Sequence, residues 1–183
     1  MARIPLMIPA SLLVLVAATP AHAAQNFYLG LGIEHGWTEM DDAISDEFDG
    51  NLTTLSAFAG ARVWLDRFIL GAEVETTLGT SYSTHGFTGD DIDRLTRLRG
   101  MAGYDFGDIT GFVAAGGTWI EGPISGPGLD NSADGWNIGI GGEYEINDMF
   151  SVRLEAIHDH TEFENGTYEW QNTSLRAGAI IRF

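Results

Sequence analysis

The chain has no cysteine and no lysine, and residues 24–183 contain no apolar run long enough for a transmembrane helix. The absence of cysteine excludes disulfides, a thiolate nucleophile and cysteine-ligated metal sites. Positive charge is also scarce, because nine arginines stand against 26 acidic residues and the net charge is -17. Such a charge repels phosphates, so we expect no nucleic-acid partner.

The first 23 residues have the three parts of a secretory signal peptide. Arg3 supplies the positive charge, residues 6–18 form the apolar segment, and residues 21–23 (Ala-His-Ala) supply small residues for cleavage. The apolar segment is too short to span a membrane comfortably. We therefore expect residues 1–23 to be removed on export, which leaves residues 24–183 as one domain.

Beyond the signal, apolar and polar residues alternate with a period of two, which predicts β-strands. The alternating stretches cover residues 27–34, 55–65, 68–78, 97–106, 109–121, 136–146, 150–156 and 174–183. The stretch 109–121 is so rich in small residues that the pattern leaves its facing open. Most of the stretches approach or exceed about ten residues, the length of a tilted strand that crosses a bilayer.

The connections between the predicted strands alternate in length. Tight turns fall at residues 66–67, 107–108 and 147–149. The other connections are longer and polar: 38–52, 80–92 and 123–134, with a shorter one around 165–166. Short periplasmic turns opposite long extracellular loops are typical of outer-membrane barrels. The sequence therefore predicts an all-β fold, an eight-stranded antiparallel up-and-down transmembrane β-barrel.

The polar face of these strands carries a balanced set of charges. In a soluble β-sandwich, the alternative fold, this face would meet water, where lysine is as suitable as arginine. Inside a small barrel the charges must be paired, and the planar arginine fork suits carboxylates. We expect Glu73 and Glu75 to face Arg97 and Arg99. The predicted lumen charge network consists of Glu34, Arg62, Glu73, Glu75, Arg97, Arg99, Glu143, Glu145, Arg153, Glu155, Arg176 and Arg182.

Most of the remaining acids fall in the predicted long loops, which indicates an anionic cell surface. These acids are Glu39, Asp41, Asp42, Asp46, Glu47, Asp49, Asp90, Asp91, Asp93, Asp130, Asp134, Glu162, Glu164 and Glu169. They lack the ligand spacing of a calcium loop, so a solvated surface is favoured over a metal site. Aromatic residues gather near strand ends, as expected for the two interfacial girdles of a membrane barrel.

The C-terminal segment 175–183 resembles the terminal signal of outer-membrane barrels, in which alternating apolar residues end on an aromatic residue. Segments 97–106 and 151–156 are similar to the small porin-like, OmpA/OmpX-type barrel superfamily. The resemblance implies recognition by the barrel-assembly machinery and a place in the Gram-negative outer membrane, among its lipids and lipopolysaccharide. The assembly-signal residues are then Leu175, Ala177, Ala179, Ile181 and Phe183.

His158, Asp159 and His160 form the one concentrated set of catalytic residue types. Small barrels include lipid A deacylases that have a serine two positions after the catalytic histidine, and here His160 occupies that position. The two histidines share one face of a strand, which could also suit a metal. Interfacial histidines are the favoured interpretation, so we expect no enzyme activity, metal or cofactor.

An eight-stranded barrel has an interior that its own side chains fill. We therefore expect a protein with a structural and surface-interaction role, which contacts an unidentified surface ligand through acidic extracellular loops. The alternative is a narrow porin-like channel for water or small ions. A lipid A hydrolase at His158 is the least favoured hypothesis.

Overall fold

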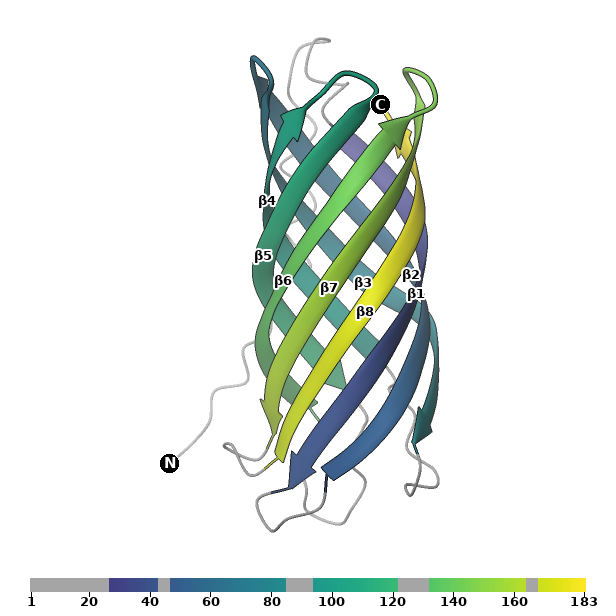
Figure 1. Cartoon of the computed structure of the whole chain (residues 1–183), viewed down its shortest axis with the longest axis vertical. Helices are drawn as coiled ribbons and strands as arrows, with labels where there is room; N and C mark the ends of the chain where they lie inside the picture. Colours follow the sequence, from purple (N-terminus) through teal and green to yellow (C-terminus); the bar gives the residue numbers. More distant parts are fainter. Residues whose placement is uncertain (1–26, 43–46, 85–93, 122–131, 164–167) are drawn as a thin grey trace, which may run out of the picture.

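The computed structural model describes residues 27–42, 47–84, 94–121, 132–163 and 168–183 (Figure 1). The predicted signal peptide and part of every long connection lie outside the described residues. No helix among the described residues could cross a membrane. The strands are β1 Phe27–Asp42, β2 Glu47–Leu65, β3 Phe68–Thr84, β4 Arg94–Asp105, β5 Ile109–Glu121, β6 Ser132–Glu145, β7 Phe150–Phe163 and β8 Tyr168–Arg182.

The eight strands form one closed barrel in which each strand pairs with its neighbour in the sequence, and β8 closes the barrel by pairing with β1. All pairs are antiparallel, and the strands tilt together around the barrel (Figure 1). Closure leaves no unpaired sheet edge along the paired region. The predicted fold class is therefore confirmed.

The apolar face of the sheet points outward and the polar face points inward. Leu31, Ile140 and Leu154 are 57–64% exposed, whereas a water-soluble protein buries most of its large aliphatic side chains. A lipid-facing apolar band explains this pattern. Trp37, Trp119 and Trp136 are exposed toward the end with the long connections, and Phe68, Phe106, Tyr144, Phe150 and Phe183 toward the end with the short turns. These two groups correspond to the expected aromatic girdles.

The short turns have the residues that their backbone requires. Asp66 and Gly107 have positive φ angles of 62° and 112°, and aspartate and glycine tolerate this region best. The Asp105 carboxylate accepts a hydrogen bond from the Gly107 backbone N–H at 2.7 Å. The Asn147 side-chain oxygen accepts the N–H groups of Met149 and Phe150, both at 2.9 Å. These contacts close the periplasmic hairpins, which lie with the C-terminus at the upper end of Figure 1.

The strands extend further toward the extracellular side than the sequence predicts. β1 and β2 remain paired through Thr38 with Gly50 and Glu39 with Asp49, in a segment that the sequence assigns to a loop. Backbone pairing does not require apolar side chains, so strands beyond the lipid carry no alternating signal. The prediction that Glu39 and Asp49 are loop residues is wrong. The same correction applies to Asp41, Asp42, Glu47, Asp134, Glu162 and Glu169, which all lie on strands.

The register also settles the facing of β5, which the sequence leaves open. Phe112, Thr118 and Ile120 are buried inside the barrel, whereas Val113 and Trp119 are exposed. In β3, one residue is inserted in the pairing with β2, because Leu55 pairs with Gly79 and Ser56 with Thr77. This bulge reverses the facing of Gly79 and Thr80, which follow it and lie opposite Leu55 and Thr54.

Candidate functional site

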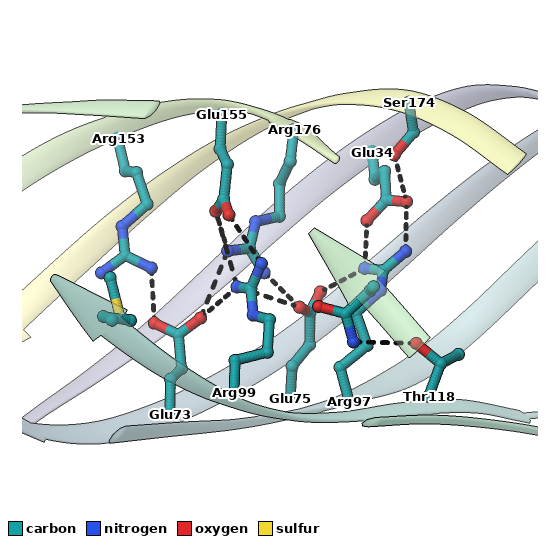
Figure 2. A network of polar contacts seen from close by, with 12 residues as sticks. Glu34, Glu73, Glu75, Arg97, Arg99, Thr118, Arg153, Glu155, Ser174 and Arg176 are labelled. Carbon is teal, nitrogen blue, oxygen red and sulfur yellow. Dashed lines mark hydrogen bonds and ion pairs between the residues drawn. The ribbon is translucent and has the colours of Figure 1, made fainter. Parts of the chain in front are cut away.

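The lumen is occupied by charged side chains that are almost completely buried. The acids and arginines concerned come from seven of the eight strands and are at most 5% exposed. Figure 2 shows most of them side by side along the barrel axis. They are Glu34, Arg62, Glu73, Glu75, Arg97, Arg99, Glu143, Arg153, Glu155, Asp159 and Arg176.

The group nearest the extracellular side is centred on Arg97 of β4. Both terminal nitrogens of Arg97 donate to Glu34 at 2.8 Å, which is a bidentate pair. Its Nε and Nη2 donate to Asp159 at 2.8 and 2.6 Å. A longer bond of 3.3 Å reaches Glu75. Ser174 donates a further bond to Glu34 at 2.7 Å. One guanidinium therefore holds three carboxylates from three strands.

The central group is a cluster of two arginines and three glutamates (Figure 2). Arg99 bonds Glu73 and donates to Glu155 at 2.6 Å. Arg176 pairs with Glu155 and Glu75, and it reaches Glu73 at 3.3 Å. Each carboxylate of this group therefore contacts at least two guanidiniums. Such multiple pairing offsets the cost of burying charge in a water-poor interior.

The group nearest the periplasm combines ion pairs with aromatic rings. Arg62 makes a bidentate pair with Glu143 at 2.6 and 3.1 Å. Arg153 reaches Glu143 at 3.3 Å and also bonds Glu73 of the central group. The hydroxyl of Tyr28 donates to Glu73 at 2.7 Å, and the Arg62 guanidinium lies 4.2 Å from the Tyr28 ring centroid. The three groups therefore join into one chain of contacts along the lumen.

The structure brings the predicted lumen residues together except for Glu145 and Arg182. These two pair with each other at the periplasmic rim, where the Glu145 side chain is 39% exposed. Cross-strand neighbours within the network include Glu73 opposite Arg99 and Glu75 opposite Arg97.

Sequence reasoning missed Asp159 as a lumen residue. It was grouped with the adjacent histidines, although the period of two places it on the same face as Glu155. Its carboxylate is fully buried and also accepts bonds from Thr118 at 3.0 Å and Asn172 at 3.2 Å. With Asp159 included, the buried set has six carboxylates and five guanidiniums.

His158 and His160 lie on the outer face of β7, opposite in direction to Asp159. His158 Nδ1 lies 3.0 Å from the Thr173 hydroxyl, and His35 makes the same kind of pair with Thr53 at 2.9 Å. Because the pairing recurs at two places, we interpret it as a cross-strand structural contact. Among the described residues, no group of three or more His, Cys, Asp or Glu side chains could hold a metal ion.

The residues of the predicted assembly signal lie on the outer face of β8. Leu175, Ala177 and Ala179 are exposed toward the lipid side, Ile181 is half-buried, and Phe183 is 54% exposed at the periplasmic rim. The Phe183 backbone N–H donates to the Phe27 carbonyl at 2.9 Å, which extends the pairing of β1 with β8 by one hydrogen bond.

A closed eight-stranded barrel with an apolar exterior and a charged, filled interior defines the class of outer-membrane β-barrels. The chain belongs to the outer membrane protein beta-barrel domain family, whose model matches residues 10–183. Membership places the protein in the outer membrane of a Gram-negative cell. No curated protein matches the sequence.

Two solved structures show the same fold. Neisserial surface protein A (NspA) is 14% identical, with 86% of this chain and 97% of that chain covered and a TM-score of 0.53. Ail, the attachment invasion locus protein of Yersinia pestis, is 11% identical, with 86% and 99% covered and a TM-score of 0.53. At these identities the likeness extends to the fold alone.

Proposed function

We propose that the protein is a non-conducting barrel that acts through its extracellular surface, with a lumen that serves to hold the barrel closed. The observation that carries the proposal is the continuous chain of ion pairs from Arg62 near the periplasm to Asp159 near the cell surface. An ion that crosses the lumen must displace members of all three groups.

The energetics of the network support a closed lumen. Leaving one buried charge without its partner costs about 3–5 kcal/mol, so a state with one such charge unpaired is populated at roughly one part in 10² to 10⁴. A path that conducts ions needs several ion pairs to be broken at the same time along the barrel axis. Tyr28, Phe58 and Phe112 also fill the periplasmic half, where the Arg153 guanidinium lies 4.9 Å from the Phe58 ring and 5.0 Å from the Phe112 ring.

Conductance across a planar lipid bilayer tests this proposal. We expect the refolded protein to give no stepwise currents in concentrated potassium chloride. The matched control is the double variant Glu73→Ala/Arg99→Ala. It removes the five ion pairs that these two residues make with each other and with neighbours in the network, so it breaks the chain at several points and should leak. Reproducible steps from the wild-type protein would overturn the proposal and support a narrow channel for water or small ions.

The surface role is supported by the acidic outer face above the extracellular girdle. Glu39, Asp134, Glu162 and Glu169 lie on strands and project outward in that region. We infer that the surface ligand is positively charged. Polylysine binding to cells that produce the protein should fall with added salt and with the variant Glu39→Gln/Asp134→Asn/Glu162→Gln. Unchanged binding by that variant would contradict the inference.

We also infer that the protein is not a hydrolase. The side chain of Asp159 points away from His158 and into the lumen, so the carboxylate cannot orient the imidazole. Expression should leave the acyl composition of lipid A unchanged. A change that is lost in His158→Ala would show that the inference is wrong.

A further inference from the structure

A row of carboxylates crosses the outer face of the barrel at its extracellular end. The register pairs Asp134 of β6 with Glu162 of β7, and Glu162 with Glu169 of β8. Adjacent strands lie about 4.8 Å apart, and like charges in directly opposite positions destabilise a sheet. A positive charge placed within this row would therefore be stabilising.

His160 lies within reach of two members of this row. Its Nε2 is 3.6 Å from Glu162 Oε1 on the same strand, and its Nδ1 is 3.4 Å from Glu169 Oε1 on β8. The imidazole stacks on Trp136 of β6, with ring centroids 5.4 Å apart and an interplanar angle of 26°. Three strands therefore fix the ring, and its side chain is only 20% exposed.

The groups around His160 are acidic or neutral on every neighbouring strand. β6 contributes Asp134 and Trp136, β7 contributes His158 and Glu162, and β8 contributes Glu169 and Gln171, whose amide donates to Glu169 at 2.7 Å. In the described part of the chain, arginines lie in the lumen, at the periplasmic rim, in the β2–β3 turn or on β4. The outward-facing one, Arg94, lies on β4, two strands away from β6, and pairs with Glu121. Among the described residues on the outer face of β6, β7 and β8 near His160, the histidines therefore supply any positive charge.

We propose that His160 is a proton-binding site that links β7 to β8 when the medium becomes acidic. A second ring proton makes both nitrogens donors, one toward Glu162 and the other toward Glu169. The charged ring then lies over the Trp136 face, which favours a cation. A neutral imidazole has one donor and can serve only one carboxylate. The two ring nitrogens point in opposite directions, so a single metal ion could not use both contacts.

This inference does not depend on a closed lumen, because His160 lies on the outer face. Trp136 provides a direct signal, since a protonated imidazole quenches indole fluorescence more strongly than a neutral one. We would measure the emission difference between the wild type and Trp136→Phe from pH 8 to pH 5. The protein would be refolded into phosphatidylcholine vesicles, whose headgroups do not titrate in this range.

We expect Trp136 emission to fall on acidification, and most of the fall to be lost in His160→Gln. His158→Gln is the matched control, because His158 lies at a similar 5.7 Å from Trp136 but its Nδ1 faces Thr173, and no carboxylate of the described residues forms an ion pair with it. A fall that survives in His160→Gln, or that is lost equally in His158→Gln, would overturn the proposal.

Discussion

Replacement of Arg97 by methionine is the sharpest test of the lumen network. Methionine has a similar length but no charge, so the change removes the guanidinium that holds Glu34 and Asp159. Glu75 keeps its ion pair with Arg176. Two buried carboxylates therefore lose the one guanidinium that contacts them in the structure.

Removal of one partner of a buried ion pair costs about 3–5 kcal/mol. We expect Arg97→Met to lower the free energy of unfolding by about 4 kcal/mol, which corresponds to a factor of about 10³ in the folding equilibrium. The triple variant Arg97→Met/Glu34→Gln/Asp159→Asn removes the unpaired charges as well. It should recover about half of the loss or more, because neutral amides can be buried at lower cost.

The assay is urea unfolding in phosphatidylcholine vesicles, followed by tryptophan fluorescence and by heat-dependent migration on a gel. Arg94→Met is the matched control on the same strand, because its ion pair with Glu121 is 3.7 Å long and both side chains are more than half exposed. Its cost should stay below about 1 kcal/mol. Equal losses for Arg94→Met and Arg97→Met, or no recovery in the triple variant, would refute the reasoning.

Two further predictions concern folding and assembly. In Gly116→Ala the new Cβ would lie 1.9 Å from the Leu98 carbonyl oxygen, so the folded, heat-modifiable band should be lost, whereas Gly100→Ala, with its nearest contact at 3.9 Å, should keep it. Deletion of Phe183 should lower the amount of folded protein in the outer membrane more than it lowers synthesis, as judged by quantitative blotting of cell fractions; normal folded levels would contradict this.

The strands that cross the lipid could be predicted from the sequence because lipid demands apolar residues at every second position. Beyond the extracellular aromatic girdle the strands no longer contact lipid, so apolar residues are not required there. The prediction failed in this region: Thr38, Glu39 and Asp49 show no apolar alternation, although they lie in paired strands. The facing of β5 stayed open in the sequence for a related reason. Gly116 and Gly117 are equally small, so only the pairing with β4 shows which one faces the lumen.

The charged residues of the lumen could be identified because they share a face with the polar positions of each strand. Their partners across the barrel could not, since pairs such as Arg62 with Glu143 or Arg97 with Glu34 join strands that are not neighbours. Asp159 was missed because its histidine neighbours suggested chemistry, although the alternation that places Glu155 in the lumen applies to it equally.

The network also has a consequence for the rate at which the barrel comes apart. Ser174 and Glu34 are 140 residues apart in the sequence, and Arg176 and Glu73 are 103 residues apart. Contacts of such separation form only when β8 meets β1, which makes folding slow. In reverse, β3, β4 and β7 each carry two or more members of the network, so none of these strands can detach without leaving several charges unpaired at once. We therefore expect the barrel to persist through slow unfolding, so that its lifetime in the membrane exceeds what its equilibrium stability alone would give.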